Sequence, residues 1–411
     1  MDLRKAAEEY KSDLIRIRRH VHMNPELGFL ESETSKFIQD ELVKLGLEYK
    51  LFARTGLTSE IKGEAGDGKT ILIRADIDAL PLQEDNDTVY KSHNDGVMHA
   101  CGHDTHIACL LGVAKLLNEN KSMFKGKALL VFQPAEEGSK LYDPSGETSG
   151  GAMPMIQEGA IGDIESPKID AAIALHIVAG DEEDTMYPNI SVKDGPLTAA
   201  ADEIYADIIG KGGHGSAPHS AVDPVYLTSV IVSQLQGMLT RYVDPMEPHV
   251  LTFGKIVGGT RQNIIPDSVR IEGTLRTLDR DLREKLLGKI ASFIETTAEL
   301  HGGTANVEIV RGYGVGVNDK MLNDHIRSAF TQYYDKENLI EIEKAQLGAE
   351  DFFEFGLQGK LPTSMFWLGG GNREKNMTSP NHSNFFDIDE DSLPIGTVVL
   401  AQSALNYLNA N

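Results

Sequence analysis

Apolar residues in the first part of the chain recur at two spacings, one typical of helices and one typical of strands. The helical spacing of three to four residues covers 3–22 and 31–45. Short apolar runs that alternate with helical stretches predict strands at 57–63, 70–75, 127–132 and 170–175, and helices at 104–118 and near 150–158. This alternation predicts an α/β fold with a mostly parallel sheet covered by helices.

The pattern changes near residue 198. The next elements follow the order strand, helix, strand, strand, helix, strand, which is the βαββαβ order of a ferredoxin-like domain. They cover strands 201–209, 249–257, 267–276 and 305–311, and helices 224–240 and 280–300. An α/β pattern then resumes with helix 319–333, strand 362–368 and helix 391–408. We therefore predict one domain in two parts, 1–197 and 314–411, with a second domain inserted at 198–313.

The composition limits the classes of partner. A chain of 411 residues favours two domains over one. The formal net charge of −23 argues against nucleic acids and anionic membranes, which attract basic surfaces. The chain has two cysteines, no apolar signal segment and no stretch that could span a membrane. We therefore expect a reduced, cytoplasmic location.

Chemically active side chains gather where the predicted strands end, which is where open α/β sheets bind their ligands. Cys101 and His103 stand two residues apart at the entrance to the predicted helix 104–118. The strand ends carry Asp76, Asp78, Glu136, Glu137 and His176, and a glycine-rich loop after strand 362–368 leads to His382. The remaining histidines, among them His20, His22, His99, His106 and His325, are assigned ordinary structural positions.

Each of these residues has a simpler explanation when it is taken alone. Two adjacent acids are usually an exposed pair, and a buried histidine is usually a hydrogen-bonded core residue. Their common position at the ends of one sheet favours a shared site instead. The thiolate, imidazole and carboxylate groups suit two divalent ions, Zn²⁺ or Mn²⁺, with Co²⁺ and Ni²⁺ as alternatives. These ligand types belong to Cys101, His103, Glu137, His176 and His382.

Glu136 is the carboxylate next to this ligand set. A carboxylate in that position suits a general base that acts on a metal-held water. The role assigned to Glu136 also argues against the main alternative, a non-catalytic binding protein stabilised by metals on the same scaffold.

A second alternative comes from residues 63–70, which match the phosphate-loop pattern Gly-x₄-Gly-Lys-Thr of nucleotide-binding enzymes. That loop needs a helix directly after its Lys-Thr pair, because the helix N-terminus binds the phosphate. The residues after Thr70 instead predict a strand, so we interpret Gly66–Gly68 as a tight hairpin turn.

Several motifs together resemble the M20 metallopeptidases, in particular the amidohydrolase branch of aminoacylases, carboxypeptidases and plant auxin-conjugate hydrolases. They are NPELG at 24–28, RADIDALP at 74–81, MHACGHD at 98–104, FQPAEEG at 132–138, GKGGHGS at 210–216, NIIPD at 263–267, GTLR at 273–276 and GAEDF at 348–352. The resemblance implies a two-metal catalytic domain and an inserted lid domain that forms a homodimer. The segment 139–149 is longer than the family pattern, which puts the rim of the site in doubt.

The resemblance also implies roles for individual residues. The five ligand types match the family's metal ligands, with Cys101 as the bridging one, and Glu136 matches the base. Asp78 matches a carboxylate that supports a ligand. His214, Asn263 and Arg276 match lid residues that contact substrate, and His214 is expected to complete the partner's site.

We therefore expect an amidohydrolase or carboxypeptidase. Its expected substrate is a small N-acyl amino acid or dipeptide with a free carboxylate, because the Arg276 guanidinium and the Asn263 amide suit a carboxylate. In a hairpin-like arrangement, both residues would face one pocket.

Overall fold

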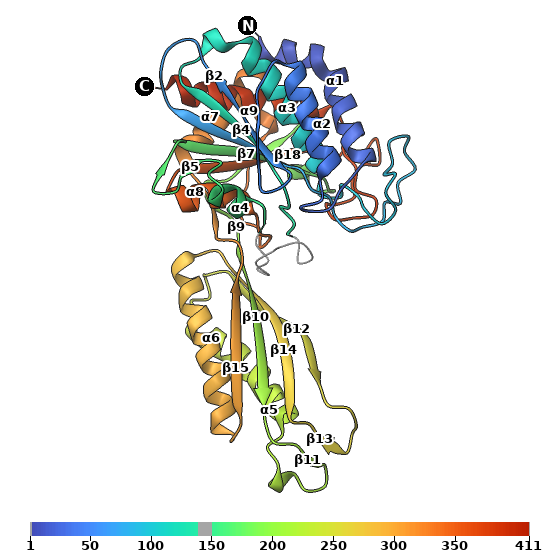
Figure 1. Ribbon diagram of the computed structural model, residues 1–411, viewed down its shortest axis with the longest axis vertical. Coiled ribbons are helices and arrows are strands. Elements are labelled where there is room, and N and C mark those ends of the chain that lie inside the picture. The colour runs from blue at the N-terminus through green and yellow to red at the C-terminus, as the bar shows by residue number, and fades with distance from the viewer. Residues whose placement is uncertain (1, 139–149, 411) are drawn as a thin grey trace. The chain divides into compact units, whose positions relative to one another are not determined.

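The computed structural model describes residues 2–138 and 150–410, and the chain divides into two compact units (Figure 1). The first unit comprises Met1–Gly195, Val317–Lys344 and Asp351–Asn411, and the second comprises Pro196–Gly316 and Ala345–Glu350. The short piece Ala345–Glu350 belongs to the second unit, although its sequence lies within the part assigned to the first domain. The domain limits at 198 and 313 stay a prediction.

An eight-stranded, mostly parallel sheet forms the centre of the first unit, in the order β1-β2-β4-β3-β7-β18-β8-β17. Strands β4, β3, β7 and β18 run parallel in its middle, and each is made of almost continuous apolar residues, as a strand buried on both faces requires. The strands are β1 (Lys50–Phe52), β2 (Gly56–Lys62), β3 (Thr70–Asp76), β4 (Lys127–Gln133), β7 (Ala171–Val178), β8 (Ile190–Val192), β17 (Leu339–Glu341) and β18 (Thr363–Gly369).

Helices α3 and α9 lie directly on this sheet, and α1 packs across both of them (Figure 1). Residues on all sides of α3 and α9 are buried, which explains their weak amphipathic pattern. The larger helices are α1 (Leu3–Met23), α2 (Ser32–Lys44), α3 (His103–Glu119), α7 (Lys320–Tyr333) and α9 (Ser392–Asn409). Shorter elements are α4 (Ala152–Gln157), α8 (Glu354–Gly359), β5 (Gly162–Asp163), β6 (Ser166–Pro167), β9 (Gly195–Thr198) and β16 (Gly316–Asn318).

The segment 63–69 is not the predicted hairpin turn. Strand β4 lies between β2 and β3 in the sheet, so the segment crosses the end of β4 rather than joining two neighbouring strands. Its backbone bonds to the loop before β4, where Glu64 N donates to Lys121 O (2.8 Å) and Ala65 N donates to Phe124 O (3.1 Å). Thr70 then begins β3 and no helix, which excludes a phosphate loop here.

The second unit contains one antiparallel sheet in the order β12-β14-β10-β15 and two helices. Alternate residues of β10 are buried, so one face of this sheet carries the apolar side chains that pack against α5 and α6. Asp223 caps α5 by accepting from two backbone N–H groups. The elements are β10 (Ala200–Ile209), β11 (Gly213–His214), α5 (Pro224–Tyr242), β12 (His249–Gly258), β13 (Ile264–Ile265), β14 (Ser268–Thr277), α6 (Arg280–Leu300) and β15 (Thr304–Arg311).

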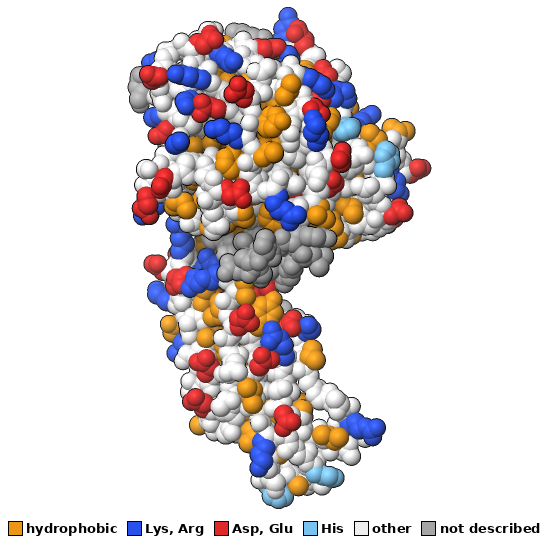
Figure 2. All heavy atoms as spheres, viewed as in Figure 1, with side chains coloured by type: hydrophobic (Ala, Val, Ile, Leu, Met, Phe, Trp, Pro, Cys, Tyr) orange, Lys and Arg blue, Asp and Glu red, His pale blue; other side chains and the backbone are white. Residues whose placement is uncertain are grey.

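Charged residues of both signs are interspersed over the visible surface (Figure 2). The edge strand β12 also exposes apolar side chains, since Ile256 and Val257 are each 55% exposed. None of the helices within the described residues combines the length and apolar character needed to cross a membrane.

Candidate active site

The predicted site residues of the first unit come from five separate segments that meet at one edge of the large sheet. Asp76 ends β3, and Asp78 follows it. Glu136 and Glu137 follow the end of β4, and His176 lies near the end of β7. Parallel strands bring their carboxyl ends to the same edge, so residues far apart in sequence become neighbours here.

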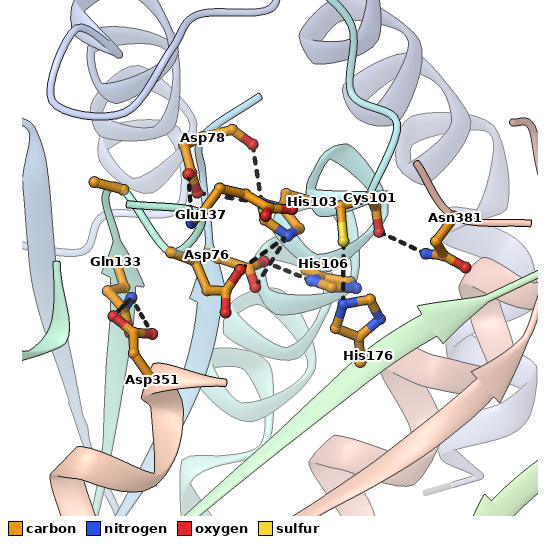
Figure 3. Close-up of polar contacts among 12 residues, drawn as sticks. Asp76, Asp78, Cys101, His103, His106, Gln133, Glu137, His176, Asp351 and Asn381 are labelled. Carbon is orange, nitrogen blue, oxygen red and sulfur yellow. Dashed lines mark hydrogen bonds and ion pairs between the residues drawn. The ribbon is translucent and has the colours of Figure 1, made fainter. Parts of the chain in front are cut away.

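Cys101 and His103 flank a residue with a left-handed backbone, Gly102, at φ +87°. A Cβ atom on Gly102 would lie 2.2 Å from the Ile177 side chain, so the position requires glycine for space as well as for conformation. This turn starts α3 at His103 and directs the thiol and the imidazole into one small volume (Figure 3).

Cys101 lies at the centre of the ligand cluster. Its Sγ atom is 3.4 Å from His176 Nε2 and 3.3 Å from His382 Nε2. His382 Nε2 is in turn 3.1 Å from Glu137 Oε1. The thiol therefore faces one imidazole on each side, and one of these also contacts the glutamate.

His103 is oriented by Asp78. Its Nδ1 atom donates to the Asp78 backbone oxygen (2.9 Å) and lies 3.2 Å from the Asp78 carboxylate (Figure 3). Its Nε2 atom is buried and has no hydrogen-bond partner among the described residues. This atom lies 4.0 Å from Glu136 Oε2. The same Nε2 lies 3.5 Å from Asp76 Oδ2, so it faces two carboxylates. An imidazole held through Nδ1 whose buried Nε2 faces carboxylates and makes no hydrogen bond has the arrangement of a metal ligand.

The ligand atoms form overlapping groups that fit two divalent ions. One group is Cys101, His103 and His176, and another is Cys101, Glu137 and His382. Within each group the ligand atoms all lie within 4.8 Å of one another. The two groups share Cys101, which is the arrangement that a bridging thiolate requires.

The charges of the site also favour bound cations. Burial raises the pKa of Cys101 well above its ordinary value, and Glu137 and Glu136 raise it further. Burial lowers the pKa of His103, but Asp76, Asp78 and Glu137 outweigh this and raise it to about 10. The carboxylates thus leave an excess of negative charge, which a divalent ion would neutralise while it stabilised the thiolate.

Backbone hydrogen bonds hold the ligand segments together. Asp78 accepts the Glu137 N–H at 3.0 Å, so one carboxylate orients two predicted ligands. Asn381 donates to the backbone oxygens of Cys101 (3.0 Å) and Ile177 (3.1 Å) (Figure 3). The His382 N–H donates to Ala100 O at 2.8 Å. These bonds fix the loop of His382 to the segments that carry the other ligands.

The sequence analysis missed a buried polar network behind the ligands. Arg74 donates to Asp76 (2.6 Å) and to Asp351 (2.9 Å). Gln133 also donates to Asp351 (Figure 3). His106, which we had assigned an ordinary position, forms a third possible ligand group with Asp76 and His103. Its spacing of three residues from His103, on the same side of a helix, was the available signal.

His214, Asn263 and Arg276 lie in the second unit, and the structure brings only two of them together. His214 in β11 pairs with Ile264 in β13, and the Gly215 N–H donates to Asn263 O at 2.9 Å. Arg276 lies near the far end of β14, whose ten residues span about 30 Å. The expectation that Asn263 and Arg276 of one chain face one pocket was wrong, because β14 separates them.

The sequence profile of Peptidase family M20/M25/M40 matches residues 72–406. The chain belongs to this family. Thermostable carboxypeptidase 2 of Saccharolobus solfataricus is 37% identical over 412 residues, covering 99% of this chain and 98% of its own. N-acetyl-L-cysteine deacetylase of Bacillus subtilis is 36% identical, covering 98% of this chain and 89% of its own.

A solved structure supports the two-metal interpretation. The Bacillus subtilis YXEP protein, described as a dinuclear metal-binding peptidase of the M20 family, superimposes with a TM-score of 0.81. It is 30% identical and covers 98% of this chain and 100% of its own. Together with the overlapping ligand groups, this family membership identifies a metal-dependent amidohydrolase or peptidase with two divalent ions. The long segment 139–149 lies outside the described residues.

Proposed function

We propose that this family member cleaves the amide bond of N-acyl or N-aminoacyl amino acids that carry a free carboxylate, with Glu136 as general base. The observation that supports this most directly is the position of Glu136. It is buried, its Oε2 lies 4.0 Å from His103 Nε2, and it is not needed by the two groups that share Cys101.

Divalent ions held by the five ligands would polarise the amide carbonyl and make an adjacent water more acidic. Glu136 accepts the proton of the attacking water as its oxygen bonds to the carbonyl carbon. Glu136 then returns that proton to the amide nitrogen as the C–N bond breaks, so an amine and a carboxylic acid are released, and the acid loses its proton to solvent. Asp78 holds His103 in the orientation this arrangement needs.

We also propose that the second unit is a ferredoxin-like lid that forms a homodimer. Its strand order and its βαββαβ element order support the fold. The edge strand β12, with its exposed Ile256 and Val257, offers an apolar, self-complementary surface for a second copy.

His214 is our proposed oxyanion donor for the partner's site. Its Nδ1 accepts from the Ser216 N–H (3.1 Å), which places the proton on Nε2. An exposed Nε2–H can donate to the oxygen of a polarised carbonyl. Because His214 and Asn263 share one end of the unit and Arg276 lies at the other, a pocket that uses all three takes them from two chains.

Arg276 is the proposed carboxylate anchor. It is half-buried, and its guanidinium makes no hydrogen bond or ion pair within the described parts of the chain, so the surface ion pair that would explain it otherwise is missing there. Burial lowers the pKa of its guanidinium, although Asp202 and Glu203 oppose this. A free carboxylate would compensate that desolvation. A carboxypeptidase and an N-acetyl-L-cysteine deacetylase, as named, both act on substrates with such a group.

The metals we propose are Zn²⁺ or Mn²⁺, with Co²⁺ and Ni²⁺ as alternatives, because the set mixes one thiolate with imidazoles and carboxylate. We place the enzyme in the cytoplasm, because the buried Cys101 must remain reduced to act as a ligand.

The test is the hydrolysis of a panel of N-acetyl, longer N-acyl and aminoacyl amino acids by protein loaded with each metal. We expect amine release by the wild type, and a loss of roughly 10²-fold or more in kcat for Glu136→Gln. A fully loaded wild type that cleaved no member of the panel would contradict the proposal and favour a binding protein on this scaffold.

A further inference from the structure

The general base follows a residue with an unusual backbone. Ala135 directly precedes Glu136 and has φ +50°, in the left-handed region that residues with a Cβ atom rarely adopt. Such a conformation persists only where its surroundings impose it. The direction in which Glu136 and Glu137 leave β4 therefore depends on what holds Ala135.

Among the described residues, three hydrogen bonds of the Ala135 backbone hold this turn. The Ala135 oxygen accepts from Gly138 N (3.2 Å) and Gly151 N (3.1 Å). The Ala135 N–H donates to the Glu31 carboxylate at 2.9 Å. The first two contacts are bonds between backbone atoms, which a side-chain substitution does not remove. The Glu31 carboxylate is therefore the contact that mutation can test.

The segment of Glu31 also touches the turn directly. A Cβ atom on Gly28 would lie 2.9 Å from the Ala135 Cβ, so this glycine permits the close approach. Nearby, the Ala79 N–H donates to Glu26 O at 2.8 Å, which ties the same segment to the residue after Asp78. Gly28 and the backbone oxygen of Glu26 thus lie behind the catalytic turn, whereas the Glu26 side chain bonds to the start of α2 instead.

A fully buried carboxylate such as Glu31 is energetically unfavourable if its role is purely structural. Its side chain is fully buried, and its second oxygen accepts from Thr55 Oγ1 at 2.6 Å. Burial and the charge of Asp78 raise the pKa of Glu31 to about 7. Burying an ionisable group costs free energy, and such groups concentrate where a geometry is functional.

We propose that Glu31 is a positioning residue for catalysis, which holds the left-handed turn at Ala135 and thereby fixes Glu136 against the site. This inference rests on the proposed function of Glu136, because Glu31 acts through that residue.

The test compares Glu31→Ala with Glu31→Gln and with a matched control, Glu26→Ala. Gln keeps an oxygen that accepts the Ala135 N–H, and its amide can donate to Thr55. Glu26 lies five residues away and accepts from the N–H groups of Glu33 and Thr34, so its loss weakens the start of α2 and leaves the turn intact.

We expect Glu31→Ala to lose roughly 10²-fold in kcat with KM within a few-fold of wild type, since small misplacements of a catalytic group have effects of that size. Glu31→Gln and Glu26→Ala should keep kcat within a few-fold. In a Glu136→Gln background, Glu31→Ala should cause almost no further loss. Equal kcat for Glu31→Ala and Glu26→Ala, or an additive loss in the double variant, would overturn the proposal.

Two further measurements keep the inference independent of activity. Hydrogen exchange of the Ala135 amide in the dimetal protein should become faster in Glu31→Ala and stay protected in Glu31→Gln and Glu26→Ala. Gly28→Ala, which presses on Ala135 while it keeps Glu31, should lower kcat as Glu31→Ala does. If Glu136→Gln kept wild-type kcat, the proposed base would be wrong, and the exchange result alone would then decide whether Glu31 holds the turn.

Discussion

The imidazole of His106 hydrogen-bonds through Nδ1 to the Asp76 carboxylate at the end of β3. Its Nε2 accepts the N–H of Ile177, the residue after His176, at 2.8 Å. One buried side chain therefore connects the end of β3 to the strand that carries His176, a predicted metal ligand. The Nε2 acceptor also fixes the tautomer, with the proton on Nδ1.

This link predicts that His106→Ala weakens metal binding. Without the imidazole, His176 is held less firmly, and we expect the affinity of one ion to fall about 10–100-fold, the usual effect of losing a group that supports a ligand. Competition with a chelator measures this. His325→Ala, on α7 away from the ligands, is the control and should bind both ions as the wild type does.

Elemental analysis of the active protein should find two divalent ions per chain. Glu137→Gln removes a ligand from one group that shares Cys101 and should lose one ion, whereas Glu136→Gln should keep both. A single ion in the wild type, or identical metal content in the two variants, would contradict the assigned roles.

Arg276→Ala should lower selectivity for the free carboxylate. The wild type should prefer an N-acetyl amino acid to its C-terminal amide strongly, because a guanidinium binds the carboxylate through two charge-assisted hydrogen bonds. The variant should lose most of that preference, as measured by kcat/KM for the two substrates. A wild type that cleaved both equally well would show that Arg276 is not a carboxylate anchor.

Mixed dimers test whether sites are shared. His214→Ala chains lack the proposed donor, and His176→Ala chains lack a ligand, so each homodimer should have little activity. A mixed dimer would contain one site with intact ligands and an intact donor from its partner, and we expect part of the activity to return. If mixed dimers form but recover no activity, His214 either acts in the site of its own chain or has no role in catalysis.

The stability should depend on pH through His22. Burial and Arg18 lower the pKa of this fully buried histidine, but Asp104 and Glu84 outweigh them and raise it to about 9. Because this is above the unfolded value of about 6.5, the contribution is complete below about pH 6.5 and is lost as the pH rises through about 9. We expect the stability difference between wild type and His22→Gln to shrink by about 3 kcal/mol over that range.

Urea unfolding of the metal-loaded protein at several pH values measures this change. His20→Gln is the control, because burial lowers the pKa of His20 and its contribution has the opposite sign. A difference for His22→Gln that stayed constant up to about pH 10 would contradict the ion pairs with Asp104 and Glu84.

Much of the site could be predicted because its residues follow from sheet geometry. His176 and Glu137 stand at or near the ends of apolar strands, and the rule that parallel strands end together brings them to one place. The limits of several strands and helices could also be predicted, since β3, β4 and α3 have strong apolar patterns and clear ends.

The supporting residues could not be predicted in the same way. His106 and Glu31 act through bonds to backbone atoms of Ile177 and Ala135, and no spacing in the sequence shows which backbone N–H a side chain will meet. The prediction that Asn263 and Arg276 face one pocket was wrong, because the two residues are close in sequence but most of the length of β14 lies between them. The predicted hairpin at Gly66 does not form, because β4, a later segment of the chain, lies between the two strands that the hairpin would join.

The order of strands in the large sheet also determines how late in translation the site can be completed. Strand β18 lies between β7 and β8, and His382 is 281 residues away from Cys101. At roughly 5–20 residues per second, a ribosome adds His382 some 15–60 s after Cys101. During that interval the Cys101 thiol lacks the His382 segment that contacts it in the folded protein, so we expect it to be more accessible to oxidants in the nascent chain than in the mature enzyme.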